Sequence, residues 1–149
     1  MRAVVQRVQC ARVRVGGETV AEMGAGLLAF VGVARGDGPG DAQRLGRKLA
    51  HLRILADEEG RMNRSLAAAG GTLCVVSQFT LLGDARRGHR PSFAAAAPPE
   101  EAEPLVEGVV RAAEAEGVAV VTGRFRAHMR VELANDGPVT VLLDTGRLF

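Results

Sequence analysis

The stretch TLCVVSQFTL, residues Thr72 to Leu81, joins an uninterrupted apolar run to three hydrogen-bonding side chains. Its β-branched first half is typical of a strand buried on both faces, and we expect a strand over the whole stretch. Ser77, Gln78 and Thr80 come where this strand should reach its end, and burying them without partners would cost roughly 1–3 kcal/mol each. The stretch therefore predicts a core strand that either emerges into solvent or forms the floor of a site.

Six further segments have the composition of strands. The first is loosely alternating and ends at Gly16-Gly17, a dipeptide that suits a tight hairpin because glycine tolerates positive φ. The last two are separated by Asn135-Asp136-Gly137-Pro138, which we expect to connect them. These predicted strands are Ala3–Val15, Thr19–Met23, Leu27–Val33, Val118–Thr122, Ala127–Ala134 and Val139–Leu143.

Two segments have helical periodicity. In the first, Asp41 is a suitable N-cap, and leucines recur at helical spacing at positions 45, 49 and 52. The second covers Pro99–Glu116, with glutamates in its first turn, an apolar stripe, and Gly117 as its stop. Pro104 is compatible with this helix if it falls within the first four positions, whose amides have no intrahelical acceptor. Between the two helices, Ala56–Gly71 has no clear periodicity.

The strands come as neighbours in the sequence rather than in strict alternation with helices. This order favours an antiparallel or mixed sheet. We therefore predict an α+β fold, in which the sheet curls into a barrel-like core with two helices packed against it. A chain of 149 residues is long enough to bury such a core, and we expect residues 1–149 to form a single domain.

The charge of the chain is nearly balanced, with a formal net charge of +2. Of its 19 basic residues only Lys48 is a lysine, and guanidinium groups can hold phosphate with a two-pronged fork. A GC-rich genome, which favours arginine codons, accounts for most of this excess. The composition therefore leaves an RNA partner open without indicating one.

The chain lacks the patterns of a membrane or secreted protein. No apolar run approaches the roughly 20 residues that a bilayer requires, and no signal-peptide core follows Met1-Arg2. We therefore expect a cytoplasmic protein without membrane contact. Cys10 and Cys74 lie in apolar, strand-like surroundings, where free cysteine is usually a small buried hydrophobe. A disulfide, a metal site and a cofactor are accordingly not expected.

Familiar catalytic motifs are missing from the sequence, among them G-x-S-x-G, the P-loop and H-E-x-x-H. The histidines at positions 51, 89 and 128 lie far apart, and surface or packing roles suit them better than catalysis. A second polar stretch, Asn135–Thr140, lies at a strand boundary and contains an X-Pro bond, a type of which about 5–6% are cis in folded proteins. An ordinary β-turn is the alternative interpretation.

Two stretches resemble the signature motifs of the D-aminoacyl-tRNA deacylase family: VVSQFTLL at Val75–Leu82 and NDGPVT at Asn135–Thr140. The resemblance implies an enzyme that hydrolyses the ester of D-aminoacyl-tRNA, cleaves glycyl-tRNA as a side activity, and rejects L-aminoacyl-tRNA. It also implies a homodimer with its active sites at the subunit interface. Further matches follow in order along the chain: QRV at 6–8, GAGLL at 24–28, EGRMN at 59–63, RGHRPSF at 87–93 and TGRF at 122–125.

The resemblance assigns roles to individual residues of the first motif. Backbone amides around Phe79 and Thr80 would form an oxyanion hole, and Ser77 and Gln78 would shape the site and donate hydrogen bonds to it. The sequence marks no base that could activate Thr80 as a nucleophile. We therefore prefer attack by water, assisted by the 2′-hydroxyl of the tRNA, with Thr80 as a positioning residue.

The second motif would supply chiral selection. Gly137-Pro138 would be a cis peptide inserted into the partner's pocket, where rigid carbonyls hold the amino group of a D-amino acid and exclude an L side chain. Arg7 would steady this loop, and Phe125 and Met129 would line the same pocket.

The substrate partner implied is the 3′ acceptor end of aminoacyl-tRNA, with Arg86, Arg87 and Arg90 of a long basic loop as candidate phosphate contacts. Two alternatives remain open from the sequence. One is a non-catalytic tRNA-binding proofreading module on the same scaffold. The other is a general esterase for small activated esters.

Overall fold

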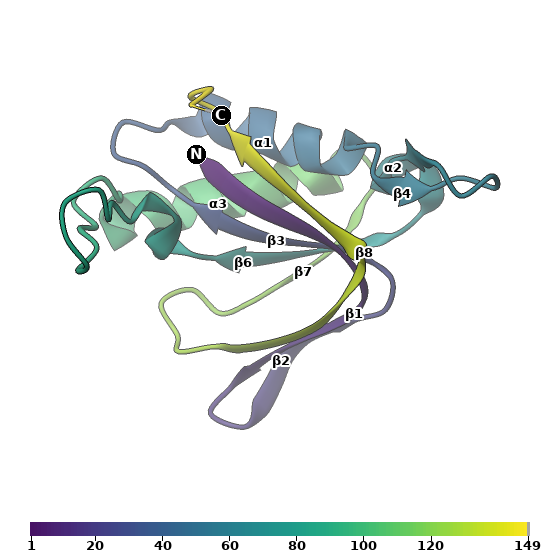
Figure 1. Cartoon of the computed structure of the whole chain (residues 1–149), viewed down its shortest axis with the longest axis horizontal. Coiled ribbons are helices and arrows are strands. Elements are labelled where there is room, and N and C mark those ends of the chain that lie inside the picture. The colour runs from purple at the N-terminus through teal and green to yellow at the C-terminus, as the bar shows by residue number, and fades with distance from the viewer. Residues whose placement is uncertain (149) are drawn as a thin grey trace.

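A computed structural model describes residues 1–148 and shows a mixed, six-stranded sheet that curls around its longest strand (Figure 1). The strand β1 (Arg2–Val15) pairs on one edge with β3 (Gly26–Gly32) along its first half and with β2 (Glu18–Met23) along its second half. On its other edge it pairs with β8 (Arg130–Asp144), and all three pairings are antiparallel. Because β1 belongs to two layers of strands, the sheet bends into a nearly closed barrel.

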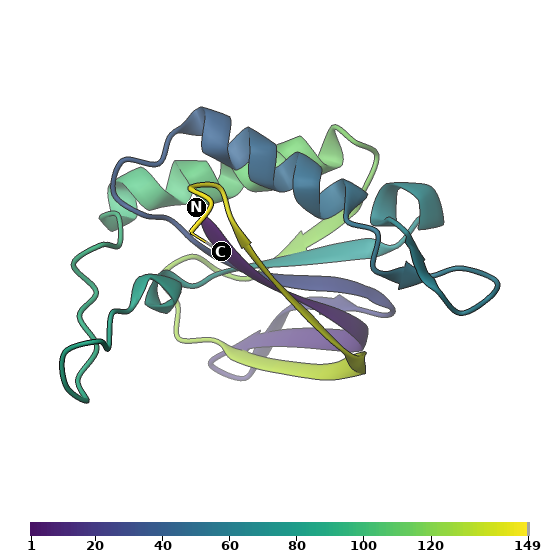
Figure 2. The same ribbon diagram turned by 45° about the horizontal axis from the view of Figure 1, so that its top comes forward.

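Two parallel strands complete the sheet beyond β3: β6 (Thr72–Ser77) and β7 (Ala119–Thr122). The helices α1 (Pro39–His51) and α3 (Pro99–Glu114) lie side by side over one face of this part (Figures 1 and 2). The remaining elements are a small hairpin, β4 (Leu55–Ala56) with β5 (Met62–Arg64), the one-turn helix α2 (Leu66–Ala69), and a 3₁₀ turn, η1 (Phe79–Leu82). The predicted α+β class, with a mixed barrel-like sheet and two packed helices, is confirmed.

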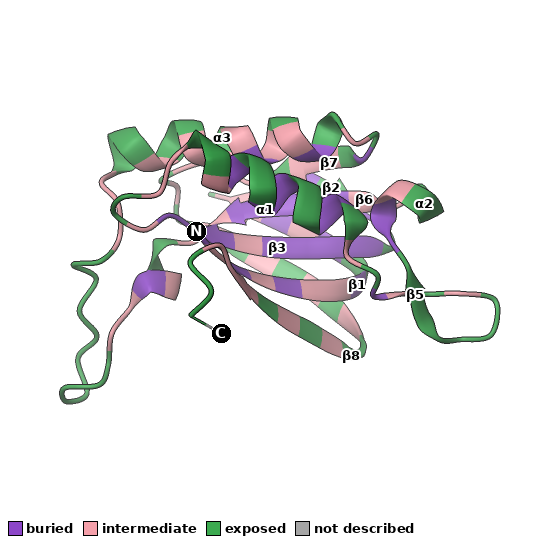
Figure 3. Cartoon of the chain, turned by 90° about the horizontal axis from the view of Figure 1, so that it is seen from above, coloured by how far each residue is buried: buried purple, intermediate pink, exposed green. Residues whose placement is uncertain are grey.

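The core fills both faces of the central strands, and Figure 3 shows β3 almost entirely purple, with Phe30 as its one intermediate residue. Leu27 and Leu73 point to the helices, where they pack with Leu45, Leu49 and Val109. Their neighbours in the sequence, led by Leu28 and Cys74, point into the barrel with Val8, Val13 and Val76. A strand covered on both faces needs no polar alternation, which explains the uninterrupted apolar runs of β3 and β6.

The contact between α1 and α3 depends on glycine. A Cβ added at Gly46 of α1 would lie 2.4 Å from the Val109 carbonyl oxygen of α3 and 2.6 Å from the Ala112 Cβ. Only a residue without a side chain allows the two backbones to approach this closely.

The strand predicted over Thr72–Leu81 is too long. β6 ends at Ser77, and η1 follows, because the chain leaves the sheet after Gln78 donates one last backbone hydrogen bond to the Val31 carbonyl, at 2.8 Å.

The two strands predicted at the end of the chain are one strand. β8 runs in a single direction along β1, from the pair Arg14–Arg130 to the pair Arg2–Asp144. The NDGP segment that was expected to connect two strands is instead accommodated within β8, where the register against β1 shifts near Val8. Bulges of this kind absorb extra residues without ending a strand.

The start of α1 also differs from the prediction. The helix begins at Pro39, with Gly38 as its N-cap, and Asp41 lies at the third helical position. From there the Asp41 carboxylate accepts the Gly38 N–H at 3.0 Å, so it caps the helix from inside.

Pro104 lies at the sixth position of α3, beyond the first turn where a missing amide has no cost. The expectation about Cys10 is wrong as well: it is exposed on β1, and only Cys74 is buried.

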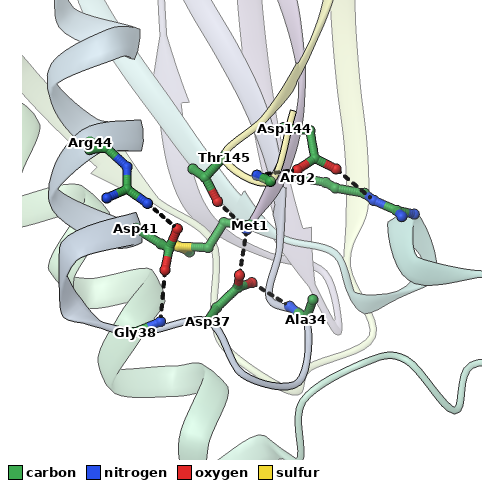
Figure 4. Close-up of polar contacts among 10 residues, drawn as sticks. Met1, Arg2, Ala34, Asp37, Gly38, Asp41, Arg44, Asp144 and Thr145 are labelled. Carbon is green, nitrogen blue, oxygen red and sulfur yellow. Dashed lines mark hydrogen bonds and ion pairs between the residues drawn. The ribbon is translucent and has the colours of Figure 1, made fainter. Parts of the chain in front are cut away.

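A polar cluster joins the two ends of the described chain to the loop before α1 (Figure 4). The Met1 ammonium donates to Asp37 Oδ1 at 2.8 Å and to Thr145 Oγ1 at 2.6 Å. Beside it, Arg2 Nε donates to Asp144 Oδ2 at 3.2 Å. The first strand, the helix entry and the end of β8 are therefore held together. No helix in residues 1–148 is long and apolar enough to cross a membrane.

Candidate active site

A cavity of about 600 Å³ opens where the parallel strands β3 and β6 end. Its walls come from the first half of α3, from the segment between β7 and β8, and from the long loop between η1 and α3. The carboxyl ends of parallel strands are a common position for ligand sites, because the chain there turns away and leaves a crevice. Among the lining residues are Ser77, Gln78, Phe79, Phe93, Phe125, Arg126, His128 and Met129.

The first motif forms the floor of this cavity. Ser77 is the last residue of β6, and η1 starts two residues later. Because the first amides of a helical turn have no intrahelical acceptor, the N–H groups of Phe79 and Thr80 are free. Neither donates to an acceptor in the part of the chain that the structure describes. Two adjacent backbone donors therefore stand at the end of β6.

The Thr80 side chain has one polar contact in residues 1–148: its hydroxyl oxygen accepts a hydrogen bond from the Gln78 side-chain amide. Thr80 is not part of the cavity lining, whereas Gln78 is. No carboxylate, imidazole or amine contacts the Thr80 hydroxyl within the described chain. The surroundings therefore hold this hydroxyl in place and provide no base.

Aromatic side chains flank the floor at the mouth of the cavity. Phe79 is 58% exposed and meets Phe93 edge to face, with ring centroids 5.2 Å apart. Phe93 comes from the long loop, which is pinned by paired bridges between Asp84 and Ser92 and between Ala34 and Ala96. Sequence reasoning missed Phe93 as a site residue, although it ends the quoted RGHRPSF motif.

The opposite wall carries Phe125 and Met129, both predicted as pocket residues. Gly123 permits the placement of Met129, since a Cβ there would lie 2.6 Å from Met129 Sδ. His128 lines the same wall, although a surface or packing role was expected for it, and its position next to Met129 is the signal in the sequence that pointed here.

The second motif lies elsewhere in the protomer. The Gly137-Pro138 peptide is cis, as the resemblance implied, and it lies in the bend of β8. No residue from 135 to 140 lines the cavity, and Figure 1 shows this bend at the opposite end of the strands from the ends of β3 and β6. Within one chain the structure therefore does not bring Gly137 and Pro138 to Ser77.

Arg7 holds the second motif in place. Its Nε donates to the Asp136 carbonyl oxygen at 3.2 Å and lies 3.1 Å from the Asp136 carboxylate, and Nη1 donates to the Ile54 carbonyl oxygen at 2.9 Å. Within the motif, Asn135 Oδ1 accepts the Val139 N–H at 2.9 Å. One guanidinium thus fastens the turn to the chain that follows α1.

The basic loop presents its three predicted arginines unequally. The Arg86 guanidinium donates to both carboxylate oxygens of Asp84, at 2.9 and 2.6 Å, and these bonds hold the pKa of Asp84 well below its usual range. Arg87 and Arg90 are exposed and have no ion-pair partner in residues 1–148. The positive charge open to a ligand therefore comes from Arg87 and Arg90.

The described residues offer neither a metal site nor a reactive buried thiol. No group of three or more His, Cys, Asp or Glu side chains in the described residues could hold a metal ion. Burial raises the pKa of Cys74 to about 11, so its thiol stays protonated and unreactive at neutral pH.

The sequence matches a family model and named proteins from other organisms. A family model described as D-Tyr-tRNA(Tyr) deacylase matches residues 4–144. A protein named D-aminoacyl-tRNA deacylase from Anaeromyxobacter dehalogenans (strain 2CP-C) is 58% identical over 149 residues, 100% of both chains. One of the same name from Roseiflexus sp. (strain RS-1) is 59% identical over 145 residues, 97% of this chain and 94% of its own.

Solved structures share the fold. One named c-Myc DNA Unwinding Element Binding Protein has a TM-score of 0.90 at 34% identity, covering 97% of this chain and 99% of the other. Another, described as a probable eukaryotic D-amino acid tRNA deacylase, has a TM-score of 0.81 at 16% identity, covering 95% of this chain and 97% of the other. At that identity the second likeness shows the fold alone.

Proposed function

The chain belongs to the D-Tyr-tRNA(Tyr) deacylase family, and we propose that the cavity at the ends of β3 and β6 is where it hydrolyses D-aminoacyl-tRNA. Relatives of 58% and 59% identity over nearly the whole chain are D-aminoacyl-tRNA deacylases, and this chain is a hydrolase of the same kind. The products are the free D-amino acid and tRNA. The observation that carries the location is the pair of free amides of Phe79 and Thr80 at the end of β6.

The two amides suit the charge that develops during ester hydrolysis. Water adds to the ester carbonyl carbon, the carbonyl oxygen becomes an oxyanion, and collapse of the intermediate expels the ribose oxygen of the tRNA, which takes up a proton. The N–H groups of Phe79 and Thr80 donate to the oxyanion, and a single donor of this kind contributes about 10²–10³ in rate. Ser77 and Gln78 shape the floor beside them.

Thr80 acts as a positioning residue. Its hydroxyl accepts from Gln78, and without a neighbouring base it is a weak nucleophile. Attack therefore falls to water, which the 2′-hydroxyl of the terminal ribose assists.

Chiral selection comes from a second copy of the chain. In a homodimer the cis Gly137-Pro138 turn of one protomer enters the cavity of the other, beside Phe125 and Met129. Backbone carbonyls there hold the amino group of a D-amino acid and leave no space for an L side chain, while glycine passes. The Arg7 contacts with Asp136 and Ile54 support this role, because a filter made of main chain must be rigid.

The acceptor end of the tRNA approaches along the long loop. The exposed Arg87 and Arg90 contact its phosphates, and the reaction takes place in the cytoplasm, where charged tRNA is found.

The primary test compares D- and L-aminoacyl-tRNA of the same amino acid. We expect loss of the D ester alone. Equal loss of both esters would instead indicate a general esterase, and binding without cleavage would indicate a non-catalytic module.

The role of Thr80 is tested by Thr80→Ala, with Thr72→Ala at the other end of β6 as the matched control. We expect Thr80→Ala to retain part of its activity. Complete loss of activity, together with an acyl group trapped on Thr80 of the unsubstituted protein, would contradict a positioning role.

The shared site is tested by subunit mixing. Gly32→Ala disturbs the floor of the cavity, and Pro138→Ala disturbs the turn, so each variant alone is impaired. A mixed dimer of C2 symmetry combines one intact floor with one intact turn, and random mixing should restore about a quarter of the sites. Mixtures no more active than their components would refute the dimeric site.

A further inference from the structure

A second hollow lies away from the cavity, between α1 and the end of β8, and we call it the α1–β8 groove. It has a volume of about 880 Å³. Figures 1 and 2 show the C-terminal end of β8 running beside the first half of α1. The groove is lined by Arg44, Leu45, Arg47, Lys48, His51, Leu142, Leu143, Asp144, Thr145 and Arg147.

Four cations line the groove against one carboxylate. That carboxylate, Asp144, is 5% exposed and is already bound by Arg2, which approaches from outside the groove. The basic side chains are Arg44, Arg47, Lys48 and Arg147. An ion entering the groove therefore meets a positive surface.

Two of the four cations have acidic partners outside the groove. Arg44 pairs with Asp41 at 2.6 Å, and Arg47 pairs with Glu116 at 3.1 Å. His51 also bonds to Glu116, and that hydrogen bond lowers the pKa of the Glu116 carboxyl.

Lys48 and Arg147, by contrast, have no ion-pair partner in residues 1–148. Lys48 comes from α1 and Arg147 from the chain after β8, and both line the groove. They therefore supply the positive charge that is open to an incoming anion.

The helix presents three cations and the His51 imidazole as a stripe. Positions 44, 47, 48 and 51 follow the spacing i, i+3, i+4 and i+7, which places all four side chains on one face. At 1.5 Å per residue the stripe is about 10 Å long. A row of that length suits a ligand with several separated negative charges better than a single small anion.

One side chain, Arg2, contacts both the groove and η1. Arg2 Nε donates to Asp144 of the groove at 3.2 Å, and its Nη1 donates to the Leu81 carbonyl oxygen of η1 at 3.0 Å. Figure 4 shows Arg2 and Asp144 beside the start of α1. Arg2 therefore connects the groove to the turn that follows the floor of the cavity.

We propose that the α1–β8 groove binds the phosphate backbone of the tRNA whose aminoacyl end lies in the cavity. This inference takes its ligand from the proposed function. Among residues 1–148, no Phe, Tyr or Trp lines the groove, so it offers no broad aromatic surface for stacking bases. It therefore contacts phosphate alone and adds affinity for tRNA without selecting a sequence.

The test removes the two unpaired cations in the double variant Lys48→Ala/Arg147→Ala. The control, Arg61→Ala/Arg111→Ala, also removes two exposed positive charges, from the β4–β5 hairpin and from α3. Hydrolysis of D-aminoacyl-tRNA is measured over a series of salt concentrations, together with hydrolysis of a short D-aminoacyl-adenosine that lacks the tRNA body.

We expect the groove variant to raise KM for tRNA with kcat unchanged, and to reduce the slope of log affinity against log salt by about 2, or about 1 per lost phosphate contact. Hydrolysis of the short substrate should not change, and the control should behave as the unsubstituted protein does on both substrates.

Several outcomes would overturn the inference while leaving the proposed function intact. One is an unchanged salt slope in the groove variant. Another is an equal loss with the short substrate, which would assign the two residues a structural role. If the control variant lost as much affinity for tRNA as the groove variant, the effect would come from net charge and not from the groove. If the groove variant changed the oligomeric state, the groove would be an interface between copies of the chain. If the unsubstituted protein cleaved no D-aminoacyl-tRNA, the proposed function itself would fail.

Discussion

Replacing Gly32 with alanine should impair catalysis through the backbone beneath the cavity. Gly32 is the last residue of β3. A Cβ added there would lie 2.7 Å from a Leu82 methyl carbon and 2.8 Å from the Gln78 carbonyl oxygen. Because ordinary contact begins at 3.4 Å, η1 would have to withdraw by about half an ångström.

This displacement would move the N–H groups of Phe79 and Thr80, which donate to the oxyanion in the proposed reaction. The Gln78 N–H is held by the Val31 carbonyl at 2.8 Å, so the segment cannot move as a whole and must rotate instead. Overpacking of this size costs about 1–3 kcal/mol of folding free energy. A misplacement of 1 Å can cost about 100-fold in rate, so half of that should lower kcat about 10-fold.

The assay pairs kcat for D-aminoacyl-tRNA at saturating substrate with the free energy of unfolding in urea. Gly24→Ala is the matched control, because its Cβ would meet no atom within 4 Å. Both values should be unchanged in the control. A Gly32→Ala protein that loses 1–3 kcal/mol of stability but keeps its full kcat would show that η1 does not position reacting groups.

Three further predictions concern stability and reactivity. Gly46→Ala should destabilise the protein by about 1–3 kcal/mol in urea because its Cβ would lie 2.4 Å from the Val109 carbonyl oxygen, whereas Gly40→Ala, 3.8 Å from its nearest neighbour, should not. Asp41→Ala should cost about 1 kcal/mol at neutral pH. The hydrogen bond from Gly38 lowers the pKa of Asp41 from its ordinary 3.8, so this difference should shrink as the pH falls below that value, and a constant difference in acid unfolding curves would contradict the cap. Iodoacetamide should label Cys10 alone in the native protein and Cys74 only in denaturant, as mass spectrometry of the peptides can show.

Local pattern predicted most of the elements, because the sheet and helices follow the periods of their side chains. The wrong predictions concern strand boundaries and burial, which depend on residues that are far away in the sequence. Nothing in NDGPVT shows that the chain on both sides of it runs along β1, since the register of β8 is set by β1 itself. Cys10 was expected to be a buried core residue, yet it is exposed on β1, next to the shift of register against β8 between Val8 and Cys10.

The residues of the site were likewise predicted only in part. The family resemblance predicted that Ser77, Gln78, Phe125 and Met129 lie together, and all four line one cavity. Phe93 was missed because it comes from a loop without periodicity, which two isolated bridges carry to the cavity.

From the amino-acid sequence alone come the family, the α+β class and the residues of both signature motifs, because these depend on residue identity and local spacing. Only the tertiary structure decided that the Gly137-Pro138 turn lies at the opposite end of the strands from Ser77, and that Lys48 and Arg147 line a groove without acidic partners within residues 1–148. The physical reason is that the distance between two motifs, and the neutralisation of a charge, depend on groups that are far apart in the chain and are brought together only by folding.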